Sequence, residues 1–318
     1  MRVRLGTRGS RLALVQSEEV AAGLRGAGAD VEIVVIKTSG DRLPQATLAD
    51  FGGKALFVKE IEDALLGGHV DVGVHSLKDM PAMLPAGLTL GAFPPREDPG
   101  DVLLTRQPGG WSALSAGAAV GTSSLRRRAL VLARRPDLRT EAIRGNVETR
   151  LDKLAAGSYE AIVLASAGLR RLGARPPHLT PLDVDEFPPA VGQGILAIEA
   201  READRELLEL LRRLDDTRSR TEATAERSFL SRLGADCHTP VAGHARMEGS
   251  TLTVTGVVAS LDGATMLRSR ATGSVQEALR LGATLADELL AKGAKALLDA
   301  SLRQSTNDRS SNDRGEGL

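Results

Sequence analysis

The chain has 318 residues, of which 42% are hydrophobic and 26% are charged, and its formal net charge at pH 7 is zero. A chain of this length is too long to fold around a single hydrophobic core, so two or three domains are expected. Only 2% of the residues are aromatic, which argues against a single-strand nucleic-acid binder because few rings are present to stack on bases. No apolar run approaches the ~18 residues of a membrane span.

The amino terminus and the cysteine content indicate the cellular compartment of the protein. The first residues, MRVRLGTRGS, lack the apolar segment of a signal peptide. Cys237 is the only cysteine, so no internal disulfide can form. Both features favour the cytoplasm, where we expect a monomer without nucleic-acid or membrane partners.

The cations are mostly arginine, with 34 arginines against seven lysines. Genomic base composition can produce this bias. Arginine also binds carboxylates and phosphates through a bidentate fork. Both explanations remain open at this point.

The first part of the chain alternates strand-like and helix-like segments. Strands are expected at 3–7, 31–37, 70–74 and 88–93, and helices after Ser10 and around 57–65. This order predicts a mostly parallel sheet covered by helices. We assign residues 1–94 and 195–216 to lobe 1.

The pattern then restarts near residue 101. Strands are expected at 102–105, 119–121, 138–142, 161–165 and 195–199, and helices from 124, at 147–156 and at 169–172, with a connection at 174–194. We assign residues 100–189 to lobe 2. Two such units predict an α/β fold with two lobes, mixed but mostly parallel sheets, and a ligand cleft between the lobes.

The pattern changes again in the last third. A helix leads to Cys237, strands are expected at 252–259 and 265–270, and a long helix at 275–298. Residues 217–302 therefore form a small α+β domain. Residues 303–318 are polar and repetitive, and we expect them to be disordered.

Two motifs lead to negative predictions. The glycines at 192 and 194 fit G-x-G-x-x-A, but they follow a proline-rich loop and precede a strand, so we reject a nucleotide site. Five histidines and one cysteine lack the spacing of a zinc site, so no metal is expected.

Three predicted strand-to-helix turns carry arginine, at 8–10, 121–128 and 144–150. Helix amino termini bind anions through free backbone N–H groups. A solvated basic face would explain one such turn, but three favour a ligand with several carboxylates or phosphates.

Lys78 and Asp79 follow the predicted strand at 70–74. An aspartate among cations stays ionised and can stabilise a developing positive charge. A plain surface ion pair is the alternative for this dipeptide.

Cys237 also allows two interpretations. Free cysteine is often a small buried hydrophobe, or it can act as a thiolate in covalent chemistry. Gly, Asp and Pro flank it, which places it on a loop, and loops often carry function.

Together these segments resemble the porphobilinogen deaminase family, also called hydroxymethylbilane synthases, over about residues 2–300. The resemblance rests on TRGS (7–10), GGKALF (52–57), HSLKD (75–79), GTSSLRR (121–127), RGNV (144–147), PAVGQG (189–194) and the Cys237 loop. It implies two lobes like those of periplasmic binding proteins and a third domain.

The resemblance also implies residue roles. In this family the loop cysteine, here Cys237, carries a dipyrromethane cofactor through a thioether. The family usually has two glycines before it, whereas this chain has Ala235 and Asp236. Asp79 would be catalytic and Phe57 would pack on a pyrrole ring. The implied cofactor and substrate contacts are Arg8, Ser10, Lys54, Lys78, Ser124, Arg126, Arg127, Arg144, Arg150, Arg170 and Arg171.

The implied activity is a transferase reaction of tetrapyrrole biosynthesis. Four porphobilinogen molecules condense head to tail with loss of ammonia, and water releases hydroxymethylbilane. The acetate and propionate groups of each pyrrole would explain the arginine turns. A cytoplasmic bilobal binding module for a polycarboxylate is the alternative, although it gives Cys237 no role.

Overall fold

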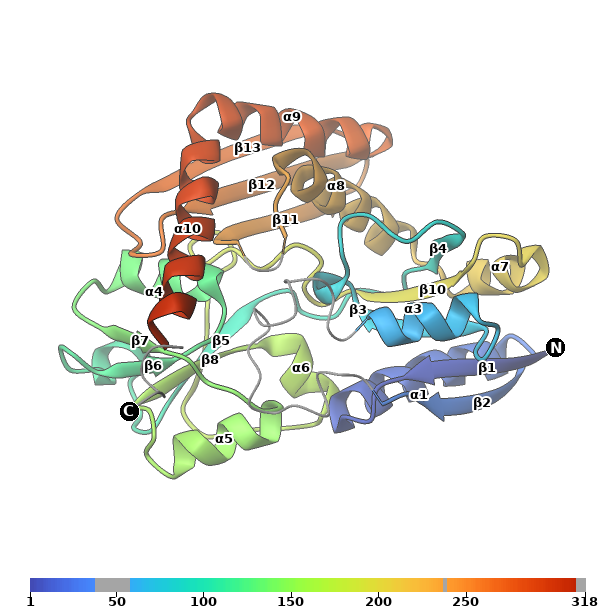
Figure 1. Ribbon diagram of the computed structural model, residues 1–318, viewed down its shortest axis with the longest axis horizontal. Coiled ribbons are helices and arrows are strands. Elements are labelled where there is room, and N and C mark those ends of the chain that lie inside the picture. The colour runs from blue at the N-terminus through green and yellow to red at the C-terminus, as the bar shows by residue number, and fades with distance from the viewer. Residues whose placement is uncertain (38–57, 237–238, 313–318) are drawn as a thin grey trace.

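The computed structural model describes residues 1–37, 58–236 and 239–312, with side chains described as far as residue 303. Figure 1 shows two lobes side by side, blue to cyan and green, with an orange to red third domain above them. The bilobal α/β fold with a small C-terminal α+β domain, expected from the sequence, is confirmed.

Lobe 1 is built on a five-stranded sheet with the order β2-β1-β3-β10-β4. Its strands are β1 (Arg2–Thr7), β2 (Asp30–Val35), β3 (Val72–Ser76), β4 (Leu88–Ala92) and β10 (Leu196–Arg201). β1 pairs in parallel with β2 and β3, whereas β10 runs antiparallel to both of its neighbours, β3 and β4. Four of the five strands therefore share one direction.

Lobe 2 repeats this plan with the order β7-β6-β8-β5-β9. Its strands are β5 (Asp101–Thr105), β6 (Ala119–Gly121), β7 (Arg139–Glu141), β8 (Ala161–Ala165) and β9 (Leu179–Pro181). β5 is the strand that opposes the other four. The chain crosses between the lobes twice, from β4 to β5 and from β9 to β10, so each sheet receives its reversed strand directly after a crossing.

The helices of the two lobes cover these sheets. Within the described residues they are α1 (Arg11–Gly26), α3 (Lys59–Leu66), α4 (Leu125–Arg134), α5 (Val147–Ala155), α6 (Ser166–Arg171) and α7 (Arg205–Leu211). Val20 and Leu24 of α1 are fully buried against strand residues such as Val3 and Leu5. The apolar spacing that predicted this helix is thus the face that the sheet covers.

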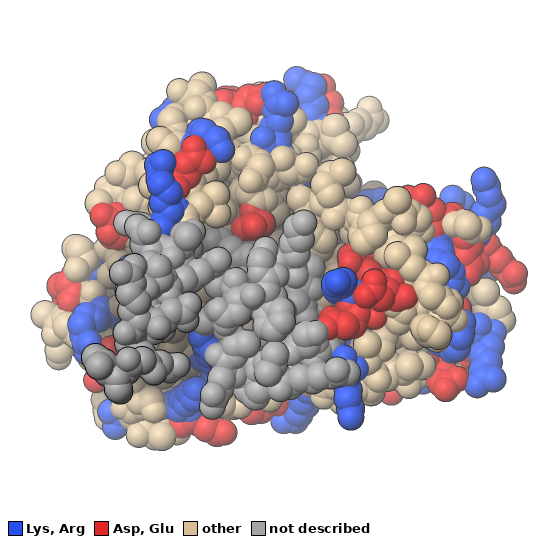
Figure 2. Space-filling model, viewed as in Figure 1, with Lys and Arg blue, Asp and Glu red and all other residues tan. Residues whose placement is uncertain are grey.

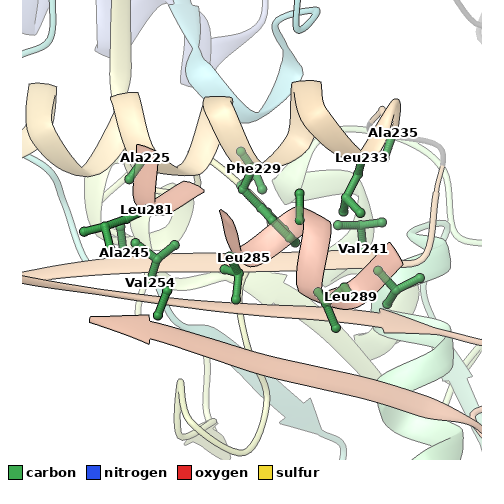
Figure 3. Packing of buried hydrophobic residues seen from close by; sticks show 14 of the residues in the cluster. Ala225, Phe229, Leu233, Ala235, Val241, Ala245, Val254, Leu281, Leu285 and Leu289 are labelled. Carbon is green, nitrogen blue, oxygen red and sulfur yellow. The ribbon is translucent and has the colours of Figure 1, made fainter. Parts of the chain in front are cut away.

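The third domain packs helices on an antiparallel sheet. It contains α8 (Thr217–Leu233), β11 (Val241–Glu248), β12 (Thr251–Ala259), β13 (Met266–Ser274), α9 (Ala278–Ala291) and α10 (Ala294–Asn312). Phe229 of α8 lies at the centre of its core, among Leu285, Val241 and their neighbours (Figure 3). A Cβ on Gly256 would lie 2.6 Å from the Phe229 ring, so this strand position needs glycine.

The strands expected from the sequence are all present, but among the described strands and α-helices three were not foreseen: β9, β11 and α7. β11 begins with Val-Ala-Gly, so small residues weaken the β-branched pattern of a strand.

The helix expected at 275–298 was wrong as a single element, because Gly293 adopts φ 97° and separates α9 from α10. The tail expected to be disordered from 303 instead continues as α10 to Asn312. No glycine or proline interrupts residues 294–312, so a helix started in the domain core can propagate. Among the described residues, no helix is long and apolar enough to cross a membrane.

Candidate active site

The residues predicted to act together lie at the carboxyl ends of parallel strands. β1 and β3 in lobe 1, and β6 and β7 in lobe 2, each end directly before one of the predicted motifs. Carboxyl ends of parallel strands share one edge of a sheet, where α/β proteins bind ligands. The arginine turns and the Lys78–Asp79 pair therefore occupy the expected edges.

Lys78 and Asp79 lie in a short 3₁₀ helix, Leu77–Asp79, directly after β3. The Asp79 side chain is exposed and Lys78 is half-buried. Lys78 Nζ donates to Oε1 of Gln193 at 3.4 Å. Burial lowers the pKa of Lys78 to about 8, opposed by the charge of Asp79 and reinforced by Arg127. This ammonium group is therefore still mostly charged at neutral pH.

Arg150, which belongs to lobe 2, interacts electrostatically with Asp79 of lobe 1. Its side chain is half-buried in α5, and its Nε donates to the carbonyl oxygen of Gly145 at 2.9 Å. Burial and then Arg127 lower the pKa of Arg150, while Asp79 opposes the shift. Lys78, Asp79, Arg127 and Arg150 thus interact electrostatically across the two lobes, and we call them the strand-end site.

Arg126 and Arg127 have a protein carboxylate as partner. Asp101, at the start of β5, has one oxygen 2.7 Å from Arg126 Nη1 and the other 2.7 Å from Arg127 Nη2. All three side chains are buried. Burial alone would raise the pKa of Asp101, but the two guanidinium groups outweigh it and hold that pKa below its usual range. Much of the binding capacity of these arginines is therefore used inside the protein.

These two arginines also hold backbone groups. Arg126 Nη1 donates to the carbonyl of Pro188 at 2.8 Å, and Arg127 Nη1 donates to that of Val163 at 3.1 Å. The Nε of Arg126 is buried and has no hydrogen-bond partner among the described residues. It is therefore a buried donor whose hydrogen bond is not made within the described residues.

Asp101 and Gln193 are functional candidates that the sequence analysis missed. Gln193 is buried, and its Nε2 donates to Asp101 Oδ1 at 3.0 Å and to the carbonyl of Pro99 at 2.7 Å. Because Gln193 also accepts from Lys78, it connects that lysine to the Asp101–arginine cluster. The sequence offered two signals for these residues. Asp101 is a charged residue at the start of an apolar strand, and Gln193 is the glutamine of the PAVGQG sequence.

The serines of the arginine turns are helix caps. Ser10 Oγ accepts from the backbone N–H of Ala13 at 3.3 Å, and Ser124 Oγ accepts from that of Arg127 at 3.4 Å. Such caps satisfy backbone donors of the first helical turn. These hydroxyl groups therefore position the turns.

The remaining arginines divide by exposure. Arg171 is largely buried and lies 3.1 Å from Glu19 of α1, so it joins the lobes, and the exposed Arg170 lies 2.9 Å from Asp98. Arg144 is exposed and Arg8 is half-buried.

The cysteine loop is described only at its edges. Cys237, Lys54 and Phe57 lie outside the described residues. Gly234 ends α8 with φ 64°, and Ala235 is buried in the core of the third domain (Figure 3). Thr239 Oγ1 donates to the carbonyl of Asp236 at 2.6 Å across the loop. The methyl group of Ala235 is thus accommodated as a core contact.

Within the part of the chain that the structure describes, no group of three or more His, Cys, Asp or Glu side chains is placed to hold a metal ion.

Comparisons with known proteins cover most of the chain. The family model for the dipyrromethane cofactor binding domain of porphobilinogen deaminase matches residues 3–209, and the model for its C-terminal domain matches residues 220–291. A porphobilinogen deaminase of Syntrophobacter fumaroxidans is 48% identical over 299 residues, 93% of this chain and 97% of the relative. One of Brevibacillus brevis is also 48% identical, over 95% of this chain and 98% of the relative.

Among solved structures, an ABC-transporter periplasmic substrate-binding protein from Coxiella burnetii matches with a TM-score of 0.42 and 16% identity, covering 67% of this chain and 91% of that one. The two family models and the relatives settle the assignment: the chain belongs to the porphobilinogen deaminase family of transferases.

Proposed function

We propose that this chain condenses four porphobilinogen molecules head to tail into hydroxymethylbilane, with Asp79 as the catalytic residue. One observation carries the proposal: Asp79 is an exposed carboxylate directly after β3, next to Lys78 in the same short 3₁₀ helix. Arg150 of the other lobe interacts with it electrostatically. The substrate has the matching groups, because each pyrrole bears two carboxylates and a ring N–H.

The dipyrromethane cofactor of the family fits these residues. It carries carboxylates, and the strand-end site supplies cations on both lobes. The buried Nε of Arg126 without a described partner is a further donor for such a group. Lys78, Arg126, Arg127 and Arg150 would hold its carboxylates, and Cys237 would attach it through a thioether. The cofactor supplies a pyrrole carbon that acts as the nucleophile and primer for the new chain.

The protein side chains then assist the departure of ammonia. Asp79 accepts a hydrogen bond from the substrate ring N–H and stabilises the positive charge that spreads over the ring as the carbon–nitrogen bond breaks with its electron pair going to ammonia. Electrostatic stabilisation of this kind is often the largest single contribution to catalysis. When the new carbon–carbon bond has formed, Asp79 guides transfer of the proton lost from the ring carbon.

The cations fix the substrate in register with this carboxylate. Lys78 and Arg150 bind the acetate and propionate groups, and we assign further carboxylate contacts to Arg8, Arg144, Arg170 and Arg171. Ser10 and Ser124 hold the turns through their caps, and Lys54 and Phe57 complete the contacts. Holding reactants in this way can supply roughly 7–11 kcal/mol of the barrier reduction.

We further propose that the protein works as a cytoplasmic monomer without nucleic-acid or membrane partners. Acidic and basic residues are interspersed over much of the face drawn in Figure 2, outside its grey area. Zero net charge and mixed charges on this face of the described residues do not favour nucleic-acid binding, for which a basic stripe is typical.

The direct test is incubation of the purified protein with porphobilinogen. The proposal predicts one ammonia released for each porphobilinogen consumed, and one hydroxymethylbilane for every four. A bilobal module that only binds polycarboxylates would deplete free porphobilinogen stoichiometrically and release no ammonia. That result would exclude the proposed activity.

A further inference from the structure

The hairpin between β12 and β13 touches helix α4 of lobe 2. Gly263, in its tip, has φ 71°, and a Cβ built there would lie 2.4 Å from the backbone nitrogen of Ala133 and 2.5 Å from the carbonyl oxygen of Ala129. Both atoms belong to the α4 backbone, which cannot move as a flexible side chain can. The hairpin tip and α4 also lie together at the left of Figure 1.

The tip is a preformed turn. The N–H of Gly263 donates to the carbonyl of Ser260 at 3.0 Å, and the N–H of Ala264 donates to Oδ1 of Asp262 at 3.1 Å. Leu261 is buried. Hydrogen bonds from Ser260 and Ala264 lower the pKa of Asp262, with a smaller effect of Arg128 on α4. The turn therefore meets α4 as a rigid surface with a complementary charge.

The same hairpin also reaches the end of the cysteine loop, through the residue just before its tip. The N–H of Ala259, the last residue of β12, donates to the carbonyl of Pro240 at 3.1 Å. Pro240 follows the loop that carries Cys237, and β11 begins at the next residue. One short element thus contacts both the cysteine loop and the helix whose first turn bears Arg126 and Arg127.

We propose that this hairpin sets the distance between the cysteine loop and the arginine-bearing helix, and that Gly263 is a positioning residue for the condensation. The inference rests on the proposed function, because it assumes that Cys237 carries the primer. A side chain at 263 would push α4 and the third domain apart. Displacement of reacting groups by ~1 Å can cost about 10²-fold in rate.

The chain offers a matched control. Gly249 lies in the turn between β11 and β12 with φ 59°, and a Cβ built there meets nothing within 4 Å. Gly249→Ala and Gly263→Ala therefore introduce the same methyl group at a similar left-handed backbone conformation. Only Gly263→Ala adds a collision with α4.

The experiment compares the two variants with the unmodified protein in three measurements. Intact mass reports the cofactor, hydrogen exchange reports the α4 amides around residues 129–133, and kinetics separate kcat from KM. We expect Gly263→Ala to exchange these amides at least about 10-fold faster and to lose about 10- to 100-fold in kcat, with KM within about threefold. Gly249→Ala should match the unmodified protein in all three measurements.

A second variant keeps the test decisive if Gly263→Ala does not fold. Asp262→Ala removes the carboxylate that closes the turn and adds no atom against α4. We expect this variant to show faster exchange of the α4 amides and a lower kcat, both by smaller factors than Gly263→Ala. Unchanged α4 exchange and kcat in the folded variants would overturn the inference. If the unmodified protein itself released no ammonia, the proposed function would fail instead, so the two failures are distinguishable.

Discussion

Arg126 and Arg127 share the carboxylate of Asp101, each with a guanidinium nitrogen 2.7 Å from a different oxygen. Neighbouring residues on a helix usually point in different directions, yet both side chains here reach the same buried partner. This cluster fixes the first turn of α4, so the two arginines have a structural role besides any contact with a ligand.

Arg126→Leu and Arg144→Leu should therefore behave differently. The first leaves Asp101 buried with one cation, and breaking a buried ion pair costs about 3–5 kcal/mol of stability. The exposed Arg144 should affect stability little, but its loss should weaken carboxylate binding by roughly 1.5–3 kcal/mol. Urea unfolding followed by circular dichroism measures the first effect, and KM for porphobilinogen the second. Equal unfolding midpoints for Arg126→Leu and the unmodified protein would show that the Asp101 cluster does not stabilise the fold.

Asp79→Asn should fold normally, because the Asp79 side chain is exposed. It keeps the shape of the side chain but loses the charge that opposes the developing cation, so we expect a loss of ~10²–10³ in kcat. The steady-state rate of ammonia release at saturating porphobilinogen measures kcat. Turnover within about twofold of the unmodified protein would remove Asp79 from its catalytic role.

Lys78 should give the reaction an alkaline limit. Its pKa is lowered to about 8, so the ammonium group is charged below pH 8 and loses its proton as the pH rises through that value. Binding of carboxylates should then weaken, and KM should rise above about pH 8. In Lys78→Arg the charge persists to higher pH, so the rise should disappear. If KM rises equally with pH in both proteins, the rise is caused by the deprotonation of a group other than Lys78.

Glu62 of α3 should make stability depend on pH. It is buried, and burial, followed by the charge of Glu199, raises its pKa to about 7. The folded protein therefore holds a proton that the unfolded chain releases near 4.5, so stability falls as the pH rises from about 4.5 to 7 and stays lower above that. Glu62→Gln should thus be more stable above pH 7, by about 1–3 kcal/mol, and similar at pH 4. Equal urea midpoints for the two proteins at pH 8 would contradict this.

The local pattern of the sequence predicted most of the strands and helices, because apolar spacing reports which face is covered. Val20 and Leu24 marked α1 in this way, and the turns after β1, β6 and β7 were found from their arginines and caps. Contacts between distant segments leave no such periodic signal. The pairing of Asp101 with Arg126 and Arg127, the bridge of Gln193 to Lys78, and the Gly263 contact required the folded chain.

The intact mass of the purified protein tests the central claim most directly. If Cys237 carries dipyrromethane, the mass should exceed that of the sequence by two porphobilinogen units, each less one ammonia, and the excess should survive denaturation and thiol reagents because a thioether does not exchange with thiols. Cys237→Ala should remove the excess, since no other cysteine is present. An active preparation with the bare sequence mass would contradict the account.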